Sequence, residues 1–182
     1  MIAMADVTSL GIAAVHSGDL ESARALFRHA LEQRIAIYGR NSPAIINELA
    51  NLGNVLAELH DEAAARPLLE QALRLREQQL GPDDPVVATE LGNLGLVLQA
   101  VGDVVAARAA FERALDIQLA ARGDDHPDSA LAMANLASLL REAGDATLVR
   151  RLLVRATNVF DRRLGHSHEA TRVTRQTLLD LA

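Results

Sequence analysis

The sequence predicts an all-α solenoid built from stacked helix pairs. Three observations lead to this prediction. Sequence columns recur every 42 residues without insertion, so Leu49, Leu91 and Met133 occupy equivalent places. Apolar residues follow the three- and four-residue steps of amphipathic helices, and turn residues separate these runs. A fixed period of this length indicates a repeat array, in which each unit buries its apolar face only against its neighbours.

The second repeat shows how each repeat is built. Its first helix carries an apolar stripe of Leu49, Leu52, Val55, Leu56 and Leu59. A turn at His60-Asp61 follows, where the other repeats have glycine-aspartate. Glycine adopts positive φ at a helix end, and the aspartate can cap the next helix. His60 lacks glycine's freedom, so we expect a slightly strained or differently shaped turn. The second helix spans about 62–80, Gly81 ends it, and Pro85 opens the next one.

The same rules apply to the whole chain. They predict helices near 4–17, 20–38, 43–59, 62–80, 85–101, 104–122, 127–143 and 146–164. A last helix, at about 169–181, matches only the first helix of a repeat. We therefore predict one domain over 1–182, with repeats at about 7–48, 49–90, 91–132 and 133–174. The last helix would cap the open face of the fourth repeat, as a solenoid requires for solubility.

These columns together resemble the tetratricopeptide repeat (TPR). The second repeat contributes Leu52-Gly53, Ala65, Leu69, Ala72, Gly81 and Asp84-Pro85. The third has Leu94-Gly95, Ala107, Phe111, Ala114, Gly123 and His126-Pro127. The 42-residue period is similar to the longer repeat of kinesin light chains and many bacterial regulators. The resemblance covers about 7–182. It implies a right-handed superhelix whose first helices line a concave groove for a protein partner.

Composition narrows the classes of function. The net charge is −6, which argues against nucleic acid as a partner because no cationic surplus is present. The chain has no cysteine, which excludes disulfides and thiolate chemistry. The first six residues do not form a typical signal peptide, and no apolar run is long enough to span a membrane. We expect a cytoplasmic protein that does not bind membranes.

No motif predicts catalysis, a metal site or a cofactor. The cluster His166-Ser167-His168-Glu169 contains residue types that bind Zn²⁺ or Ni²⁺. However, His168 shares its column with Ser42, Asp84 and His126, so we favour a role in the loop that starts the next helix. Phosphate-binding, nucleophile-elbow and dinucleotide motifs are missing from the sequence. The sequence therefore predicts a protein that is not an enzyme and has no cofactor.

Arginine recurs at one place in every repeat, which invites a ligand-binding ladder. The four residues are Arg24, Arg66, Arg108 and Arg150. Glu70 and Glu112 stand four residues after the second and third of them, so we favour exposed helix ion pairs. Acids exceed arginines by eight to three in the second repeat, whereas arginines exceed acids by seven to four in the fourth. This gradient suggests the alternative function, a self-associating scaffold or a regulatory domain of a larger protein, with a homo-oligomer possible.

The preferred function is binding of a peptide or partner helix in the concave groove. Asn51, Asn93 and Asn135 share one column, and the resemblance implies that asparagines there hold a peptide backbone. The alternative is that they bond an adjacent helix and lock the repeats together. Helical spacing places further residues on the same open face. The predicted groove residues are Asn47, Asn51, Asn54, Glu58, Asn93, Leu96, Gln99, Asn135, Ser138 and Arg141.

Overall fold

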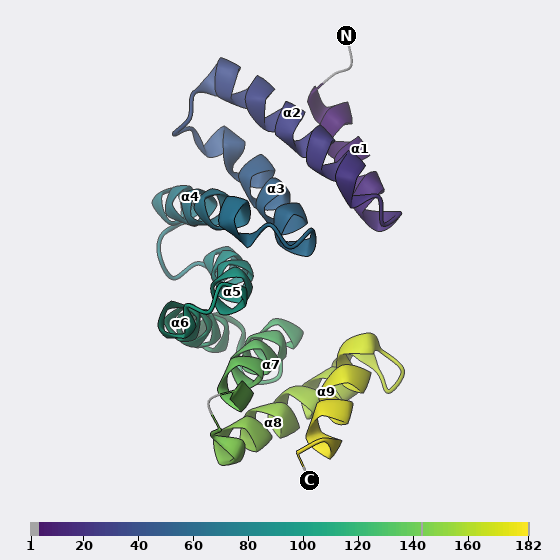
Figure 1. Ribbon diagram of the computed structural model, residues 1–182. Coiled ribbons are helices and arrows are strands. Elements are labelled where there is room, and N and C mark those ends of the chain that lie inside the picture. The colour runs from purple at the N-terminus through teal and green to yellow at the C-terminus, as the bar shows by residue number, and fades with distance from the viewer. Residues whose placement is uncertain (1–3, 143, 182) are drawn as a thin grey trace.

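The computed structural model describes residues 4–142 and 144–181, and within them every regular element is a helix (Figure 1). The α-helices are α1 (Met4–His16), α2 (Leu20–Tyr38), α3 (Ile46–Glu58), α4 (Glu62–Leu80), α5 (Pro85–Ala100), α6 (Val104–Arg122), α7 (Pro127–Glu142), α8 (Ala146–Leu164) and α9 (Glu169–Leu179). The predicted all-α fold is confirmed. One short 3₁₀-helix, η1 (Pro43–Ile45), precedes α3, so the first turn of the helix expected from residue 43 is not α-helical.

The predicted helix ends agree with the structure to within a few residues. The last helix is shorter than predicted. It was expected at about 169–181, and α9 ends at Leu179. Residue 143, at the end of the helix predicted over 127–143, lies outside the described residues, as do residues 1–3 and 182 of the predicted domain. The limits of the repeats and the capping role of α9 stay predictions.

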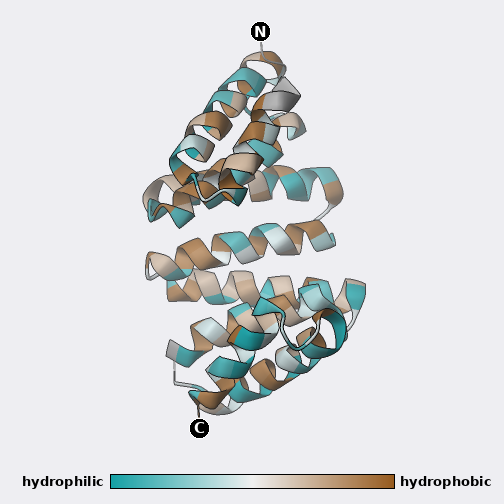
Figure 2. Cartoon of the chain, turned by 90° about the vertical axis from the view of Figure 1, so that its right-hand side faces the viewer, coloured by the Kyte–Doolittle hydropathy of each residue, from teal (hydrophilic) through white to brown (hydrophobic). Residues whose placement is uncertain are grey.

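The helices stack into a curved array. Each helix packs on the next one in the sequence, and α5 also touches α3 and α7. Figure 1 shows the chain as an arc, with α3, α5 and α7 on its hollow side and α4 and α6 on its outer side. Figure 2 looks onto the hollow side, where the helices mix apolar and polar residues along their length. The concave face is therefore built from the first helix of each pair.

The turn inside each pair has the same shape in all four pairs. Gly18, Gly102 and Gly144 have φ between 78° and 82°, and His60 has φ of 59° at the equivalent place. The following aspartate donates its amide to the preceding helix in each of the first three turns, for example from Asp61 to the Leu56 carbonyl at 2.8 Å. Of the two outcomes expected at His60, the structure shows the strained one. A non-glycine residue occupies the left-handed region and the shape of the turn is kept.

Replacing His60 by glycine is therefore expected to stabilise the fold by about 1 kcal/mol, because glycine carries no steric penalty at positive φ. The reciprocal substitution, Gly102→Ala, should destabilise the fold by a similar amount. Urea unfolding followed by circular dichroism measures both. A His60→Gly protein that unfolds at lower urea than the wild type would contradict this account of the turn.

Polar side chains cap the helices as the sequence predicts. Asp19, Asp61, Asp103 and Asp145 each accept a hydrogen bond from the backbone amide three residues later. In the loops between pairs, Ser42, Asp84, His126 and His168 each accept from the amide two residues later. His168 Nδ1 thus bonds the Ala170 amide at 3.2 Å. This places His168 in the loop role that its column predicted.

Close packing inside each pair depends on a small residue in the first helix. An added Cβ at Gly95 would lie only 2.5 Å from Cε1 of Phe111. Gly11 faces Phe27, and Gly53 faces Leu69, at similar distances. The residues at the equivalent places in the fourth pair are Ala137 and Leu153, both buried. The two helices can therefore approach each other closely only while the small residue and its large partner are matched.

Consecutive repeats are joined by a ladder of hydrogen bonds that sequence reasoning missed. In each of the second, third and fourth repeats, one long side chain from the second helix reaches back to the loop that ends the preceding second helix. The bonds are Gln71 Nε2 to the Arg40 carbonyl, Arg113 Nη2 to the Pro82 carbonyl and Arg155 Nη2 to Asp124 Oδ1, all at 2.7 Å. The three residues recur every 42 positions, and this recurrence could have indicated a shared role. The side chain changes, however, from an amide in Gln71 to a guanidinium in the two arginines.

Two buried ion pairs also join the repeats. Arg34 Nε lies 2.8 Å from Glu48 Oε1, and Arg76 Nη2 lies 3.4 Å from Glu90 Oε1. Both glutamates are buried. Each pair links the second helix of one repeat to the first helix of the next, α2 to α3 and α4 to α5. These interfaces therefore contain charge in an otherwise apolar core.

The stability of the fold should depend on pH through Glu90. Burial raises the pKa of Glu90 above its ordinary value of 4.5, and Arg76 opposes that rise. The folded protein therefore binds a proton here more readily than the unfolded chain, so Glu90 adds stability as the pH falls through this window. The Glu90→Gln variant lacks this titration. Its unfolding free energy relative to the wild type should be highest near pH 7 and decrease towards pH 4, as urea unfolding would measure. If the unfolding free energy of Glu90→Gln minus that of the wild type increased towards acid pH, the predicted direction of the pH dependence would be wrong.

Candidate functional site

The concave face carries three hollows. The N-terminal hollow, about 220 Å³, is lined by Ile12, Val15, Phe27, Asn51, Asn54, Val55 and Glu58. The central hollow, about 160 Å³, is lined by Ala88, Thr89, Gly92, Asn93, Phe111, Ala114, Gln118, Asp128, Leu131, Ala132 and Asn135. The C-terminal hollow, about 380 Å³, is lined by Leu131, Ala134, Asn135, Ser138, Arg141, Leu153, Phe160, Ala170, Val173, Thr174 and Thr177. Apolar and polar side chains line all three.

Seven of the ten predicted groove residues line these hollows. Asn51, Asn54 and Glu58 line the first of them, and Asn93 and Asn135 line the second. The last contains Asn135 again, with Ser138 and Arg141. The central and C-terminal hollows share Leu131 and Asn135 as a common wall. These two hollows are therefore neighbours along the groove.

The other three predicted residues lie outside the hollows. Asn47 is exposed, and its Oδ1 accepts a hydrogen bond from Arg76 Nη2 at 2.9 Å. This bond ties α3 to α4, so Asn47 already has a structural partner. Leu96 is exposed on α5 and Gln99 is half-buried there. Both follow the part of α5 that lines the central hollow, and neither lines a hollow of the concave face.

The asparagine column is half-buried and available for hydrogen bonding. Within the described part of the chain, no hydrogen bond joins the side chains of Asn51, Asn93 or Asn135 to another residue. Asn135 instead packs over Gly92, where an added Cβ would lie 3.7 Å from its Nδ2. Each side-chain amide offers two donors and an acceptor. These asparagines can therefore donate to the C=O groups of a peptide backbone and accept from its N–H groups.

Three charged side chains line the hollows. Asp128 is paired within the chain, since its Oδ2 lies 3.3 Å from Arg122 Nε. Glu58 and Arg141 are both exposed, and neither forms an ion pair with any residue that the structure describes. The N-terminal end of the groove is therefore acidic and its C-terminal end basic.

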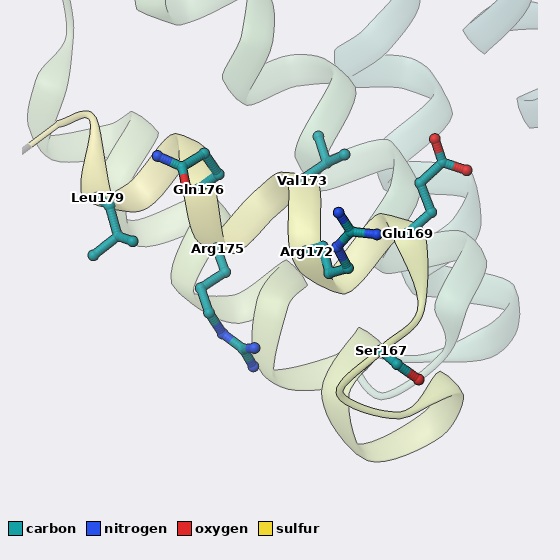
Figure 3. A pocket seen from close by; sticks show the side chains of 7 residues that line it. All are labelled: Ser167, Glu169, Arg172, Val173, Arg175, Gln176 and Leu179. Atoms are coloured by element: carbon teal, nitrogen blue, oxygen red, sulfur yellow. The ribbon is translucent and has the colours of Figure 1, made fainter.

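A fourth and larger hollow, about 550 Å³, lies on the outer face of α9 (Figure 3). Figure 3 shows Val173 on one side of α9, and Arg175 and Leu179 on the other. Val173 also lines the C-terminal hollow, so the two surfaces meet at this residue. Arg172 and Arg175 occupy the columns where earlier repeats bury Ile46 and Leu49. The residues that line this hollow belong to α9 or to the loop before it, so it is an open surface rather than a cleft between helices.

The recurring arginines form ion pairs as expected. Arg66 Nε and Arg108 Nε lie 2.8 Å from Glu70 and Glu112 respectively, and Arg24 pairs with Glu21 at 2.5 Å. The hydrogen bond that Arg66 donates to Glu70 raises the pKa of Arg66. Arg150 has no such glutamate and donates to the Leu181 carbonyl at 2.7 Å. Among the described contacts, these residues therefore act within the chain.

The basic end of the solenoid is also partly neutralised within the chain. Arg155 Nη2 lies 2.7 Å from Asp124, and Arg162 Nη2 lies 2.5 Å from Asp125. The hydrogen bond from Arg162 lowers the pKa of Asp125, and Arg163 contributes to the same shift. Charge reversal at Arg155 or Arg162 would therefore break an internal pair. Such variants do not isolate a contact between copies of the chain.

The described residues contain no group of three metal-ligating side chains. His166 bonds Asp161 rather than converging with His168, which caps α9. In the same residues, no helix combines the length and apolar character that a bilayer crossing requires. The arrangement on the concave face offers apolar contacts and hydrogen bonds.

Sequence reasoning missed the apolar residues that build the groove. Leu131 is 53% exposed and lines two hollows, and Val173 follows it one period later. Both share their column with Asn47. Asn47 was already predicted to lie on the open face. The residues one, two or three periods later could therefore have been predicted to lie there as well. Ile12 and Val15 complete the N-terminal hollow in the same way, through the columns of Asn54 and Ala57.

Comparisons with known proteins agree with this architecture. A family model described as "Tetratricopeptide repeat" matches residues 1–78, 44–120 and 85–162. A candidate kinesin light chain from Podosopora anserina with nearly identical TPR-like repeats has a similar structure, with a TM-score of 0.80 and 18% identity over 98% of this chain and 84% of that one. A variant of the same protein has a TM-score of 0.81, with 17% identity and the same coverage.

A further solved structure is similar as well. BtubC (BKLC) from P. vanneervenii has a TM-score of 0.78 and 20% identity over 96% of this chain and 70% of that one. No match was found among curated proteins. At these identities the structural likeness shows the fold, whereas the family model covers most of the sequence. The chain belongs to the tetratricopeptide repeat family.

Proposed function

We propose that the protein binds an extended segment of a partner protein along the concave face. Repeats of this family generally mediate protein–protein interaction, and solenoids use their extended concave surfaces for it. The observation that carries the proposal is the set of three hollows on the first helices, two of which share a wall at Leu131 and Asn135. Such a row suits successive side chains of one segment.

The chemistry of the hollows favours a peptide over a small-molecule substrate. Two of them fall below the ~300 Å³ at which small-molecule pockets usually begin, with volumes of about 160 and 220 Å³. Asn51, Asn93 and Asn135 can bond backbone N–H and C=O groups. An extended segment leaves those groups unpaired, whereas a helix satisfies most of them internally. A binding role without catalysis is the function that this surface supports best.

The proposal is tested by affinity capture from the native lysate with two matched variants. Leu131→Asp places a charge in the shared wall of two hollows. Val105→Asp is the control. Val105 is an apolar residue of α6 that is 83% exposed and lies outside the groove. We expect the wild type and Val105→Asp to retain the same partner, and Leu131→Asp to lose it at least tenfold. Circular dichroism verifies that both variants fold. Identical captures by all three proteins, or capture of the bait alone, would contradict the proposal.

Two further expectations from the sequence are outside this test. The cytoplasmic location and the possible homo-oligomer stay predictions. Self-association has no specific contact in its favour, since Arg155 and Arg162 are paired within the chain.

A further inference from the structure

We propose that the groove selects a partner segment of defined charge order, with a basic side chain opposite α3 and an acidic side chain opposite α7. An apolar side chain between them would lie on α5. This inference rests on the proposed function and specifies the chemistry of the partner. It follows from Glu58 and Arg141, neither of which forms an ion pair with a described residue, and from the exposed Leu96 between them.

The N-terminal hollow fits a long basic side chain. Its floor is the ring of Phe27, and Ile12 and Val15 line it as well. Asn54 and Glu58 also line this hollow, and the exposed Glu58 lies closer to solvent than the buried Phe27. Lysine and arginine have apolar stems that pack on such a floor while the charged head stays at the rim. Glu58 has no ion pair with another described residue, so its carboxylate can accept that head.

The C-terminal hollow fits an acidic side chain. Arg141 and Ser138 supply donors in a hollow that Phe160 also lines, whereas the Thr177 hydroxyl already donates to the Val173 carbonyl at 2.9 Å. Arg141 forms no ion pair with a described residue. A guanidinium binds a carboxylate through two parallel hydrogen bonds, which adds geometric selectivity to the attraction. An acidic residue of the partner is therefore favoured here, and a basic one is repelled.

The spacing of the two charges follows from the stacking of the helices. Neighbouring helices in contact lie about 10 Å apart, and α5 touches both α3 and α7. Two such steps separate Glu58 from Arg141 by roughly 20 Å. An extended chain rises about 3.3 Å per residue, so the two charged residues of the partner should stand about six positions apart. Between them, Leu96 on α5 is exposed and favours an apolar side chain.

A random display library of 12-residue peptides tests this inference on the whole chain. Peptides selected by the wild type should carry Lys or Arg and Asp or Glu about six positions apart, with apolar residues between them. Glu58→Arg should select an acidic residue at the first position. Arg141→Glu should select a basic residue at the second. Reversing either charge in a selected peptide should weaken its binding to the wild type by about fivefold or more, and salt should reduce this difference.

Two controls separate the possible failures. Arg151→Glu reverses an exposed arginine on α8, outside the groove, and should leave the selected pattern unchanged. Peptides that require Leu131 but show no charge order, or the same order with all variants, would overturn this inference and leave the groove function intact. If no selected peptide depends on Leu131, both the groove function and the charge order fail.

Discussion

Gly95→Ala is expected to destabilise the protein by about 2–3 kcal/mol, because a methyl group there overpacks a closed core. The added Cβ would lie 2.5 Å from the Phe111 ring, well inside van der Waals contact. Phe111 is 1% exposed, so the core around its ring restricts how far the ring can move. Relieving the clash therefore requires a shift of the ring or of the two helices of the third repeat. Urea unfolding measures the loss, and it should appear as a shift of the midpoint.

Two companion variants make this prediction specific. Gly92→Ala lies three residues earlier in α5 and meets only Asn135 Nδ2 at 3.7 Å. It should stabilise the helix by about 0.5–1 kcal/mol. Adding Phe111→Leu to Gly95→Ala reproduces the pair Ala137–Leu153 and should recover part of the loss. The packing account would be wrong if Gly95→Ala matched the wild type, or if Gly92→Ala were equally harmful.

Arg34→Ala should cost about 3 kcal/mol, because it leaves a buried carboxylate without its counter-charge. Glu48 is 2% exposed, and its Oε2 has no hydrogen-bond partner among the described residues. Its Oε1 would keep only the bond from Thr8 at 3.2 Å. Differential scanning calorimetry at pH 7 measures the effect as a lower Tm.

The chain itself offers the control for this pair. Two repeats later, the same interface holds Gln118 and Ala132 instead of an arginine and a glutamate. Both are buried, and Gln118 Nε2 donates to the Pro85 carbonyl at 3.1 Å. The double variant Arg34→Gln/Glu48→Ala should therefore be more stable than Arg34→Ala. A double variant as unstable as the single one would show that lost packing, rather than an unpaired charge, causes the effect.

Local rules account for most of the fold that could be predicted. The turn at His60 is one example, because its place in the glycine column is enough to expect either a strained or a differently shaped turn, and the structure shows the strained one. The loop role of His168 is another, since a capping side chain stands at that place in every repeat. Both depend on hydrogen bonds that span only a few residues. Because the sequence repeats every 42 residues, a turn or cap predicted in one repeat is also predicted at the equivalent place in the others.

Contacts between helices were harder to predict from the sequence. Arg34 and Glu48 meet across two helices. The same two residue types recur one period later as Arg76 and Glu90, but the recurrence alone does not show that the two columns meet. Asn47 illustrates the same difficulty in the groove. It lies on the open face as expected, yet Arg76 reaches it from α4 and occupies its oxygen. The partner that a long arginine side chain reaches depends on the angle at which the two helices pack. That angle cannot be read from a single sequence.

The most direct test of the account is site-specific photo-crosslinking in the native lysate. A photoreactive phenylalanine analogue replaces Leu131 on the concave face or Val105 on the outer face, both exposed apolar positions. The account predicts a covalent adduct with a partner protein from position 131 and none from position 105. Adducts that form equally from position 105, or adducts at position 131 that join only copies of this chain, would contradict a peptide-binding groove.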